Sequence, residues 1–320
     1  MQPLGWFVVV SYNENVTKQG KVYTPHSVKD FNIDDFRYDG SKPLKIKKAP
    51  NKVDDIYEDD AHYEAMLRQQ AIEMDIWQER MFSHNRFGLV TVFQALDAAG
   101  KDGTIKAVFT GTNPTGVKVA SFKRPTEKEL EHDFLWRSYL ELPERGTIAI
   151  FNRSYYEEVL VTKVHPEILT TSQRLPEKTT DDLDKLFKHR YEAIRDMERH
   201  LNRNGFPTIK FFLHVSKKEQ ADRLIARIKD SDKNWKFEEG DVAEREFWDD
   251  YQAAYEEAIN ETATDNSPWY VIPADDKKNM RLIVGRIIIA ELKKLPVTGP
   301  TPDNERFKKL QKLISVIEGQ

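Results

Sequence analysis

The sequence has 320 residues, of which 39% are hydrophobic, 32% charged and 11% aromatic. A chain of this length and composition can bury the core of one large domain or two small ones, which excludes an intrinsically disordered protein. The mean hydropathy of −0.67 and the lack of any apolar run near ~20 residues argue against a membrane span. With 49 Lys and Arg against 53 Asp and Glu, the net charge of −4 argues against a general polyanion binder.

The sequence contains no cysteine. Disulfides, a thiol nucleophile and thiolate metal ligands are therefore excluded, and a reducing cytoplasm is the expected compartment. The first residues, MQPLGWFVVVSYNEN, lack the basic lead-in and the cleavage site of a secretion signal. The eight histidines show no His-Glu-x-x-His spacing, and no Gly-x-Ser-x-Gly elbow occurs. Neither a zinc hydrolase nor a serine hydrolase is supported.

Three regions follow one another along the chain. Residues 1–55 combine turn formers with lysines and show no sustained periodicity, which predicts an extended N-terminal arm. From 56 to 295 we expect one α/β domain, introduced by a long amphipathic helix over 54–82. The stretch 296–320 predicts a linker and a short helix, which suits packing or a contact within a homo-oligomer.

Five strand-like segments alternate with helical patterns in this domain. The first, LVTVFQAL at 89–96, is apolar and rich in β-branched residues, as expected of a buried strand. The other four are 117–122, 147–152, 208–215 and 269–272. Strands joined by helices run parallel, which predicts a doubly wound sheet of about five strands. Ligands of such sheets bind beyond the carboxyl ends of the strands, so the chemistry is expected in the loops that follow them.

The loop after the first strand, residues 97–104, has the composition of a phosphate-binding loop. It reads Asp97-Ala98-Ala99-Gly100-Lys101-Asp102-Gly103-Thr104 and leads directly into a helix. Small residues here let backbone N–H groups converge on an anion, with the positive helix end behind them and the lysine as a mobile charge. The P-loop pattern Gly-x-x-x-x-Gly-Lys-Ser/Thr fails at Ala95 and Asp102. A simple strand-to-helix turn is the alternative.

The phosphate loop lacks the Ser or Thr that would bind magnesium, so the metal requires other hard oxygen ligands. Asp97 and Asp102 flank the loop. We assign the metal to Asp97 because it lies at the carboxyl end of the strand. Asp102 has a second interpretation, as a negative charge that stabilises the start of the helix.

The loop after the third strand reads Asn152-Arg153-Ser154-Tyr155-Tyr156-Glu157-Glu158. Asn152 stands where P-loop enzymes usually carry a carboxylate, and its amide can still hold a metal-bound water. Arg153 can bind phosphate through two parallel hydrogen bonds, and Glu157 can accept a hydrogen bond from a base or ribose. The two glutamates have a solvated helix face as their alternative.

Further positive charges follow the second and fourth strands. Lys123 and Arg124 end the second strand, and Arg137 lies on the helix beyond. Residues 216–241 are rich in charge and contain Gly240, which predicts a mobile lid. The cations of this lid are Arg223, Arg227, Lys229, Lys233 and Lys236. We expect these groups to contact phosphate, with solvated surfaces as the alternative.

Five segments in order resemble the polyphosphate kinase 2 family. They are LDAAGKDGTIK (96–106), SFKRPTEKELEHDFLWR (121–137), IFNRSYYEEVLVTKVHPEIL (150–169), RIKDSDKNWKFEEGDV (227–242) and SPWYVIPADDKKNMR (267–281). The asparagine at 152, followed by Arg-Ser-Tyr-Tyr-Glu-Glu, resembles the class III members. The resemblance implies a P-loop kinase-like (thymidylate-kinase-like) fold with a helical lid. It also implies reversible, Mg²⁺-dependent phosphoryl transfer from inorganic polyphosphate to nucleoside mono- and diphosphates.

The loops and the resemblance together predict the roles of individual residues. The expected catalytic residues are Asp97, Lys101 and Arg153, with Asp97 also the metal ligand. The expected phosphate or polyphosphate contacts are Ala98, Gly100, Asp102, Gly103, Lys123, Arg137, Arg223, Arg227 and Lys229. The expected nucleotide contacts are Asn152, Glu157 and Lys236. The implied cofactor is Mg²⁺, with Mn²⁺ as an alternative, and the implied partners are polyphosphate and nucleotides such as AMP and ADP, without nucleic acid or membrane.

Two other functions fit parts of the sequence. An ATP-dependent nucleoside monophosphate kinase would use the same fold and lid, but it would form no ATP from polyphosphate and ADP. A non-catalytic phosphate-binding module would bind its ligand without forming a product. The convergent cations and the lid favour an enzyme over that module.

Overall fold

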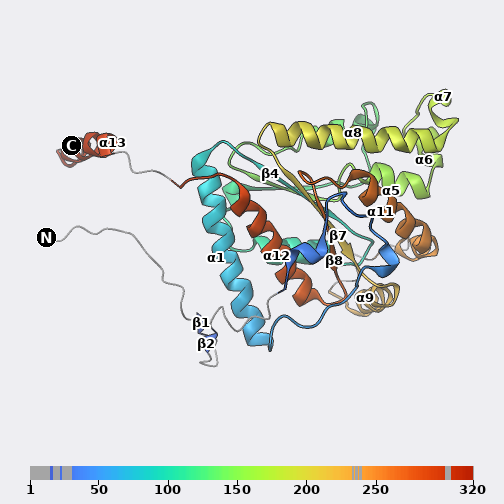
Figure 1. The fold of residues 1–320 in the computed structure, drawn as a ribbon, viewed down its shortest axis with the longest axis horizontal. Coiled ribbons are helices and arrows are strands. Elements are labelled where there is room, and N and C mark those ends of the chain that lie inside the picture. The colour runs from blue at the N-terminus through green and yellow to red at the C-terminus, as the bar shows by residue number, and fades with distance from the viewer. Residues whose placement is uncertain are drawn as a thin grey trace.

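A central sheet of six strands organises the protein, seen in a computed structural model (Figure 1). The structure describes residues 15–16, 22–23, 31–299 except 233, 235, 236, 238 and 239, and 304–319. The strand order is β3-β8-β7-β4-β6-β5. The strands are β3 (Arg37–Tyr38), β4 (Leu89–Gln94), β5 (Val117–Ser121), β6 (Ile148–Asn152), β7 (Thr208–His214) and β8 (Trp269–Pro273). A separate pair, β1 (Asn15–Val16) and β2 (Val22–Tyr23), is antiparallel.

The five long strands of the main sheet run parallel, and helices cross between them on both faces. The predicted doubly wound fold is therefore confirmed, and each predicted strand is found within two residues of its expected ends. The sixth strand, β3, adds to β8 in the antiparallel direction, with Arg37 opposite Tyr270. Sequence patterns missed it because a strand of two residues shows no alternation.

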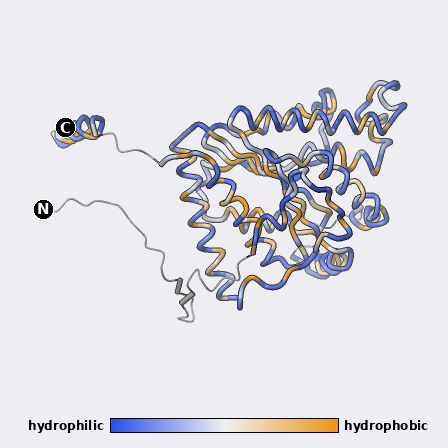
Figure 2. Tube along the Cα trace, in the orientation of Figure 1, coloured by the Kyte–Doolittle hydropathy of each residue, from blue (hydrophilic) through white to orange (hydrophobic). Residues whose placement is uncertain are grey.

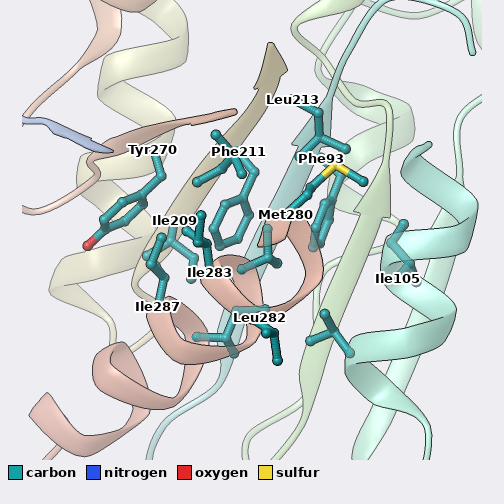
Figure 3. Packing of buried hydrophobic residues seen from close by; sticks show 14 of the residues in the cluster. Phe93, Ile105, Ile209, Phe211, Leu213, Tyr270, Met280, Leu282, Ile283 and Ile287 are labelled. Atoms are coloured by element: carbon teal, nitrogen blue, oxygen red, sulfur yellow. The ribbon is translucent and has the colours of Figure 1, made fainter. Parts of the chain in front are cut away.

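Three helices cover one face of the sheet. They are α1 (Asp60–His84), α2 (Lys101–Phe109) and α12 (Lys277–Lys294). The apolar residues of α12 lie against the strands, and Figure 3 shows Met280, Ile283 and Ile287 facing Ile209 and Phe211 of β7. This packing fixes α2, the helix that follows the phosphate loop, against the sheet.

The opposite face carries α5 (Glu157–Val164), α8 (Leu183–Arg203) and α11 (Trp248–Thr262). On this face the rings of Phe212 and Tyr255 stack with their centroids 4.1 Å apart. Figure 2 shows hydrophobic segments gathered in the middle of the molecule, along the strands. Strands β4, β6, β7 and β8 are thus buried on both faces, as expected of strands that read as continuous apolar runs, whereas the edge strand β5 is largely exposed.

The remaining helices and turns lie in the connections between these layers and, for α13, near the C-terminal end of the chain. The helices are α3 (Glu127–Leu130), α4 (Trp136–Tyr139), α6 (Glu167–Thr171), α7 (Glu177–Thr180), α9 (Lys217–Lys229), α10 (Gly240–Ala243) and α13 (Asn304–Glu318). The 3₁₀ turns are η2 (Ile33–Phe36), η3 (Ile46–Lys48), η4 (Pro114–Gly116) and η6 (Glu244–Phe247). No helix within the described ranges is both long enough and apolar enough to cross a bilayer.

Part of the expected N-terminal arm packs on the main domain instead of extending from it. Leu44 and Ile46 are buried in the core on the α11 face. The backbone N–H of Leu44 donates to Asn260 Oδ1 at 2.6 Å, and that of Ile46 donates to Glu256 Oε2 at 2.7 Å. Polar side chains of α11 therefore hold this segment, and such contacts leave no periodic pattern in the sequence.

A buried ion pair lies beneath the sheet, between β7 and α8. Lys210 Nζ donates to Glu198 Oε2 at 2.6 Å and to Ser267 Oγ at 3.1 Å. Glu198 Oε1 accepts from the hydroxyls of Tyr155 and Tyr156, at 2.8 and 2.9 Å. Burial lowers the pKa of Lys210, and the adjacent carboxylate opposes that shift. The two tyrosines directly follow the Asn152-Arg153-Ser154 turn, so this network anchors the loop after β6.

The substitution Lys210→Met tests this anchor. It leaves the Glu198 carboxylate buried without a counter-ion, so we expect the free energy of unfolding to fall by roughly 3–5 kcal/mol. Urea denaturation followed by circular dichroism measures the loss. The double variant Lys210→Met/Glu198→Gln removes both charges and should recover most of the stability. Equal stability of the single and double variants would contradict the assigned role of the pair.

Candidate active site

The phosphate loop joins β4 to α2 in an unusual backbone conformation. Gly100 has a φ of 105°, and Ala98 has a φ of 59° although it is not a glycine. Alternation of left-handed and right-handed residues turns successive N–H groups to one side, which forms an anion-binding concavity. The loop continues directly into the first turn of α2 at Lys101. The predicted strand–loop–helix arrangement is therefore present.

Side chains of helix α9 hold the phosphate loop by donating hydrogen bonds to the carbonyl groups of the loop. Gln220 Nε2 donates to the carbonyl of Asp97 at 3.0 Å. The Nη1 atom of Arg223 donates to the carbonyl of Ala99 at 2.7 Å. Its Nη2 atom donates to two further carbonyls at the end of β8, those of Ala274 at 2.7 Å and Asp275 at 3.0 Å. The buried guanidinium of Arg223 thus ties the loop to the neighbouring strand.

Arg153 forms the centre of a charged network at the end of β6. Its guanidinium donates to Glu157 Oε2 at 2.9 Å and, through Nη2, to Asp97 Oδ1. The charge of Glu157 and then that of Asp97 raise the pKa of Arg153, so it stays positive. The residue has a φ of 62°, and its N–H donates to the carbonyl of Phe93 on β4 at 3.0 Å. This left-handed turn directs the side chain across the strand ends.

Lys101 lies half-buried beside this network. Its ammonium donates to the carbonyl of Ala95 at 3.0 Å. Burial, followed by the positive charge of Arg153, lowers the pKa of Lys101 to about 8. The lysine therefore stands in a site where an added negative charge would be favourable.

A second polar contact joins the same two loops. Asn152 Nδ2 donates to Asp102 Oδ1 at 2.7 Å. Asp102 lies in the first turn of α2, where a negative charge also stabilises the helix. Both interpretations of this residue are thus compatible with its position.

The oxygen atoms of Asp97, Asp102 and Asn152 are suitable ligands for a hard divalent cation. Within the described ranges, no three His, Asp or Glu side chains gather closely enough to form a metal cage. Mg²⁺ requires no such cage, because it keeps several waters and binds through one or two carboxylates and the phosphates of the substrate. The residues present therefore fit magnesium better than zinc.

A small cavity of about 40 Å³ lies between the network and helix α11. Its lining includes Asp97, Arg153 and Glu157, together with five residues that the sequence did not single out: Gln220, Arg245, Trp248, Tyr251 and Tyr255. The three aromatic residues share one face of α11, and their spacing of three and four residues was a usable signal. Gln220 and Arg245, which hydrogen-bond to each other, carried no local motif.

A different cavity, of about 120 Å³, lies beside Arg137. Arg137 lines it and is buried, and it donates to the carbonyl of Lys123 at 2.8 Å. Its guanidinium also lies over the ring of Phe122, 5.4 Å from the centroid. The Nε atom of Arg137 is buried and has no hydrogen-bond partner in the part of the chain described. These two residues therefore do not line the cavity beside Lys101.

The remaining cations of the expected lid are dispersed. Arg227 lies 3.4 Å from Asp241 Oδ2, and Lys229 is exposed at the end of α9. Lys236 falls outside the described residues. The sequence therefore predicted correctly that Asp97, Lys101, Arg153 and Glu157 lie together, but it did not separate the buried Arg223 from its exposed neighbours.

Comparisons with known proteins agree with one another. The family described as polyphosphate kinase 2 matches residues 57–298. An "ADP-polyphosphate phosphotransferase" from Rhodopseudomonas palustris is 48% identical over 276 residues, 86% of this chain and 94% of the relative. An "AMP/ADP-polyphosphate phosphotransferase" from Meiothermus ruber is 43% identical over 72% of this chain and 81% of the relative. The crystal structure of a polyphosphate kinase 2 from Arthrobacter aurescens superposes with a TM-score of 0.78 at 32% identity, covering 89% of this chain and 98% of that chain.

The substitution Arg223→Met tests how the phosphate loop is held. It leaves several buried carbonyls without their donor, so we expect the free energy of unfolding to fall by roughly 1–3 kcal/mol. Arg227→Met, one helical turn along, is the matched control and should cost less than about 1 kcal/mol. Urea denaturation compares the two. Equal losses would show that the Arg223 contacts add nothing specific to the loop.

Proposed function

The chain belongs to the polyphosphate kinase 2 family, and on that premise we propose that it transfers the terminal phosphoryl group of inorganic polyphosphate to nucleoside mono- and diphosphates. AMP would become ADP and ADP would become ATP, in a reversible reaction. The names of the relatives support polyphosphate as donor and both nucleotides as acceptors. The same names disfavour an ATP-dependent nucleoside monophosphate kinase. The observation that carries the proposal is the meeting of Lys101 and Arg153 at a backbone turn suited to phosphate.

Phosphoryl transfer requires little covalent work from protein groups, because positioning and charge neutralisation supply most of the acceleration. In the proposed arrangement, the N–H groups of the phosphate loop and the ammonium of Lys101 hold the terminal phosphate of the donor. Arg153 neutralises charge on the transferred group. The attacking oxygen of the acceptor phosphate is already ionised at neutral pH, so no strong general base is needed. Asp97 and Asp102 then serve to orient.

We propose Mg²⁺ as the metal, with Mn²⁺ able to replace it, held chiefly by Asp97. When bound, the metal neutralises negative charge shared between donor and acceptor. The chain's own contribution is to orient the ligands. Arg153 fixes the carboxylate of Asp97, and Asn152 fixes that of Asp102. These contacts support a metal position at the mouth of the phosphate loop.

The nucleotide is assigned to Asn152, Glu157 and Lys236, with residues 216–241 as a lid. The cavity beside Glu157 measures about 40 Å³, close to the volume of a single water molecule. A nucleobase is larger, so its entry requires the end of the lid at Asp241 and the residues just beyond it, including Arg245, to move outward. Such a movement fits a lid that excludes water during transfer.

The other cations take more distant roles in this proposal. Arg227 and Lys229 bind polyphosphate from the lid, whereas Arg223 acts by holding the phosphate loop. Lys123 and Arg137 bind the donor chain farther from the transferred group, which the separate cavity and the unsatisfied Nε of Arg137 support.

We further propose a catalytic domain over 56–295, preceded by residues 1–55, of which β3 and the segment at Leu44 and Ile46 pack on that domain, and followed by the 296–320 linker and helix. A homo-oligomer fits the exposed apolar side chains of α13, which are Phe307, Leu310, Leu313, Ile314, Val316 and Ile317. A cytoplasmic location fits a chain without cysteine, and the net charge of −4 fits the absence of a nucleic acid partner.

Supplying polyphosphate, Mg²⁺ and a single nucleotide tests the proposed function. We expect ATP to form from ADP, and ADP from AMP, when no ATP is added. Lys101→Ala should lower turnover by orders of magnitude because it removes a charge that stabilises the transferred group. Lys106→Ala, an exposed lysine on the same helix, is the control and should leave turnover unchanged. Product that forms only when ATP is the donor would support the ATP-dependent kinase instead.

The lowered pKa of Lys101, about 8, gives the free protein a pH-dependent affinity for polyphosphate. The negative charge of bound phosphate raises the pKa of Lys101 again. Above pH 8, Lys101 therefore takes up a proton when phosphate binds. Affinity should therefore fall by roughly tenfold per pH unit as the pH rises above 8. Fluorescence anisotropy of labelled polyphosphate, at constant ionic strength and without metal, measures it. Lys101→Arg keeps its charge and should flatten the profile, and an equally steep profile for that variant would assign the titration to another group.

A further inference from the structure

A second and larger cleft lies on the other side of Trp248 from the catalytic network. It has a volume of about 390 Å³, within the size range of small-molecule sites. Three elements form it: the carboxyl end of β7 at His214, the first turns of α11, and a segment we call the strap, residues 46–51. Trp248 lines both this cleft and the smaller cavity beside Arg153.

Two buried polar side chains line this cleft, and one nitrogen atom of each lacks a well-aligned hydrogen-bond partner in the part of the chain that the structure describes. His214 is 5% exposed and Gln252 is 8% exposed. The Nδ1 atom of His214 and the Nε2 atom of Gln252 are both buried and unsatisfied among the described residues. The side chain of Gln252 and the backbone at Pro50 face the ring of His214, so the two side chains together form one polar edge in the cleft. Burial lowers the pKa of His214, which keeps the ring uncharged at neutral pH.

The strap is held in place independently of any ligand. Asn51 Nδ2 donates to the carbonyl of His214 at 3.2 Å, and the carbonyl of Asn51 accepts from the N–H of Asp275 at 2.9 Å. At the other end, Glu256 accepts from the N–H of Ile46. The cleft is thus preformed. The strap also lies before residue 57, where the match to the family begins.

Two lysines and two carboxylates also line the cleft. Lys47 and Lys217 line it, and the ammonium of Lys217 lies 5.9 Å from the centroid of the Trp248 ring. Of the two carboxylates that also line it, Glu256 is bonded to the strap, and Asp249 is exposed at the rim. The cleft therefore combines an aromatic surface, two buried groups for a hydrogen-bonding edge, and two lysines for an anion.

We propose that this cleft binds a nucleotide at a second site, separate from the phosphate loop. The base lies against Trp248 and pairs its polar edge with His214 and Gln252. The phosphates extend toward Lys47 and Lys217. A nucleobase can hydrogen-bond to these two side chains because its edge carries both acceptors and donors, and its flat face suits the indole ring.

The position of the cleft gives its occupant a direct connection to the active site. Ser216 lines the cleft and caps α9, accepting from the N–H of Glu219 at 3.1 Å. One turn farther along α9, Gln220 and Arg223 hold the carbonyls of the phosphate loop. A ligand that contacts Ser216 and Lys217 therefore lies at the start of the helix that holds this loop.

Titration calorimetry with ADP, on the full chain without metal or polyphosphate, tests the proposal. We expect two ADP molecules per wild-type chain. Gln252→Leu removes a donor to the base and should weaken one of the two sites by roughly tenfold or more. A thermal melt of this variant checks that the weaker binding does not come from unfolding.

A pair of double variants supplies a matched control. Lys47→Ala/Lys217→Ala removes the two lysines that line the cleft and should weaken the same site. Lys48→Ala/Lys218→Ala removes two exposed lysines that do not line it, with the same change in charge, and should retain two sites. One ADP per wild-type chain, or two undiminished sites in Gln252→Leu and in the first double variant, would overturn the proposal. A cleft that holds only water gives the first of these results.

Discussion

The catalytic arrangement depends on the way α9 binds the phosphate loop by its carbonyl oxygens. Gln220 donates to the carbonyl of Asp97 and Arg223 donates to the carbonyl of Ala99, so both carbonyls point toward the helix. A peptide whose carbonyl is held on one side presents its N–H toward the other, so these contacts help to leave the donors of the loop available for an anion. Arg223 is cationic yet largely buried, and its charge lies behind the loop, where it adds to the positive potential of the helix end.

The opposing charges beside the loop explain how an acidic protein can hold a polyanion. In the unliganded state Arg153 is neutralised by Asp97 and Glu157, while Lys101 has a lowered pKa. An anion that approaches Arg153 competes with Asp97 and leaves that carboxylate to a cation. In the proposed arrangement, binding of a phosphate and of a divalent ion at these residues is therefore mutually favourable, because each compensates the charge that the other leaves unpaired. A strongly positive surface is not required.

The sequence predicted the layers of the fold and the loops of the site, because both follow from local patterns and topology. Strands 89–96, 147–152 and 208–215 are apolar runs between turn signals, and parallel strands bring their carboxyl ends to one edge. Contacts between distant elements had no such signal. Arg223 was grouped with exposed lid cations, since charge density does not reveal burial. The packing of Leu44 and Ile46 was also missed, because the side chains that hold this segment, Asn260 and Glu256, lie more than 200 residues away in the sequence.

The loop after β6 and the loop after β4 are held in place by different elements. Glu198 and Lys210 anchor the first through Tyr155 and Tyr156, and α9 anchors the second through Arg223. Arg153 bridges the two loops, so its placement depends on both anchors. An error of about 1 Å in either loop is enough to lower a phosphoryl-transfer rate substantially. The role of the buried polar groups Lys210, Glu198 and Arg223 is therefore to restrict the two loops to one arrangement, even where their net contribution to stability is small.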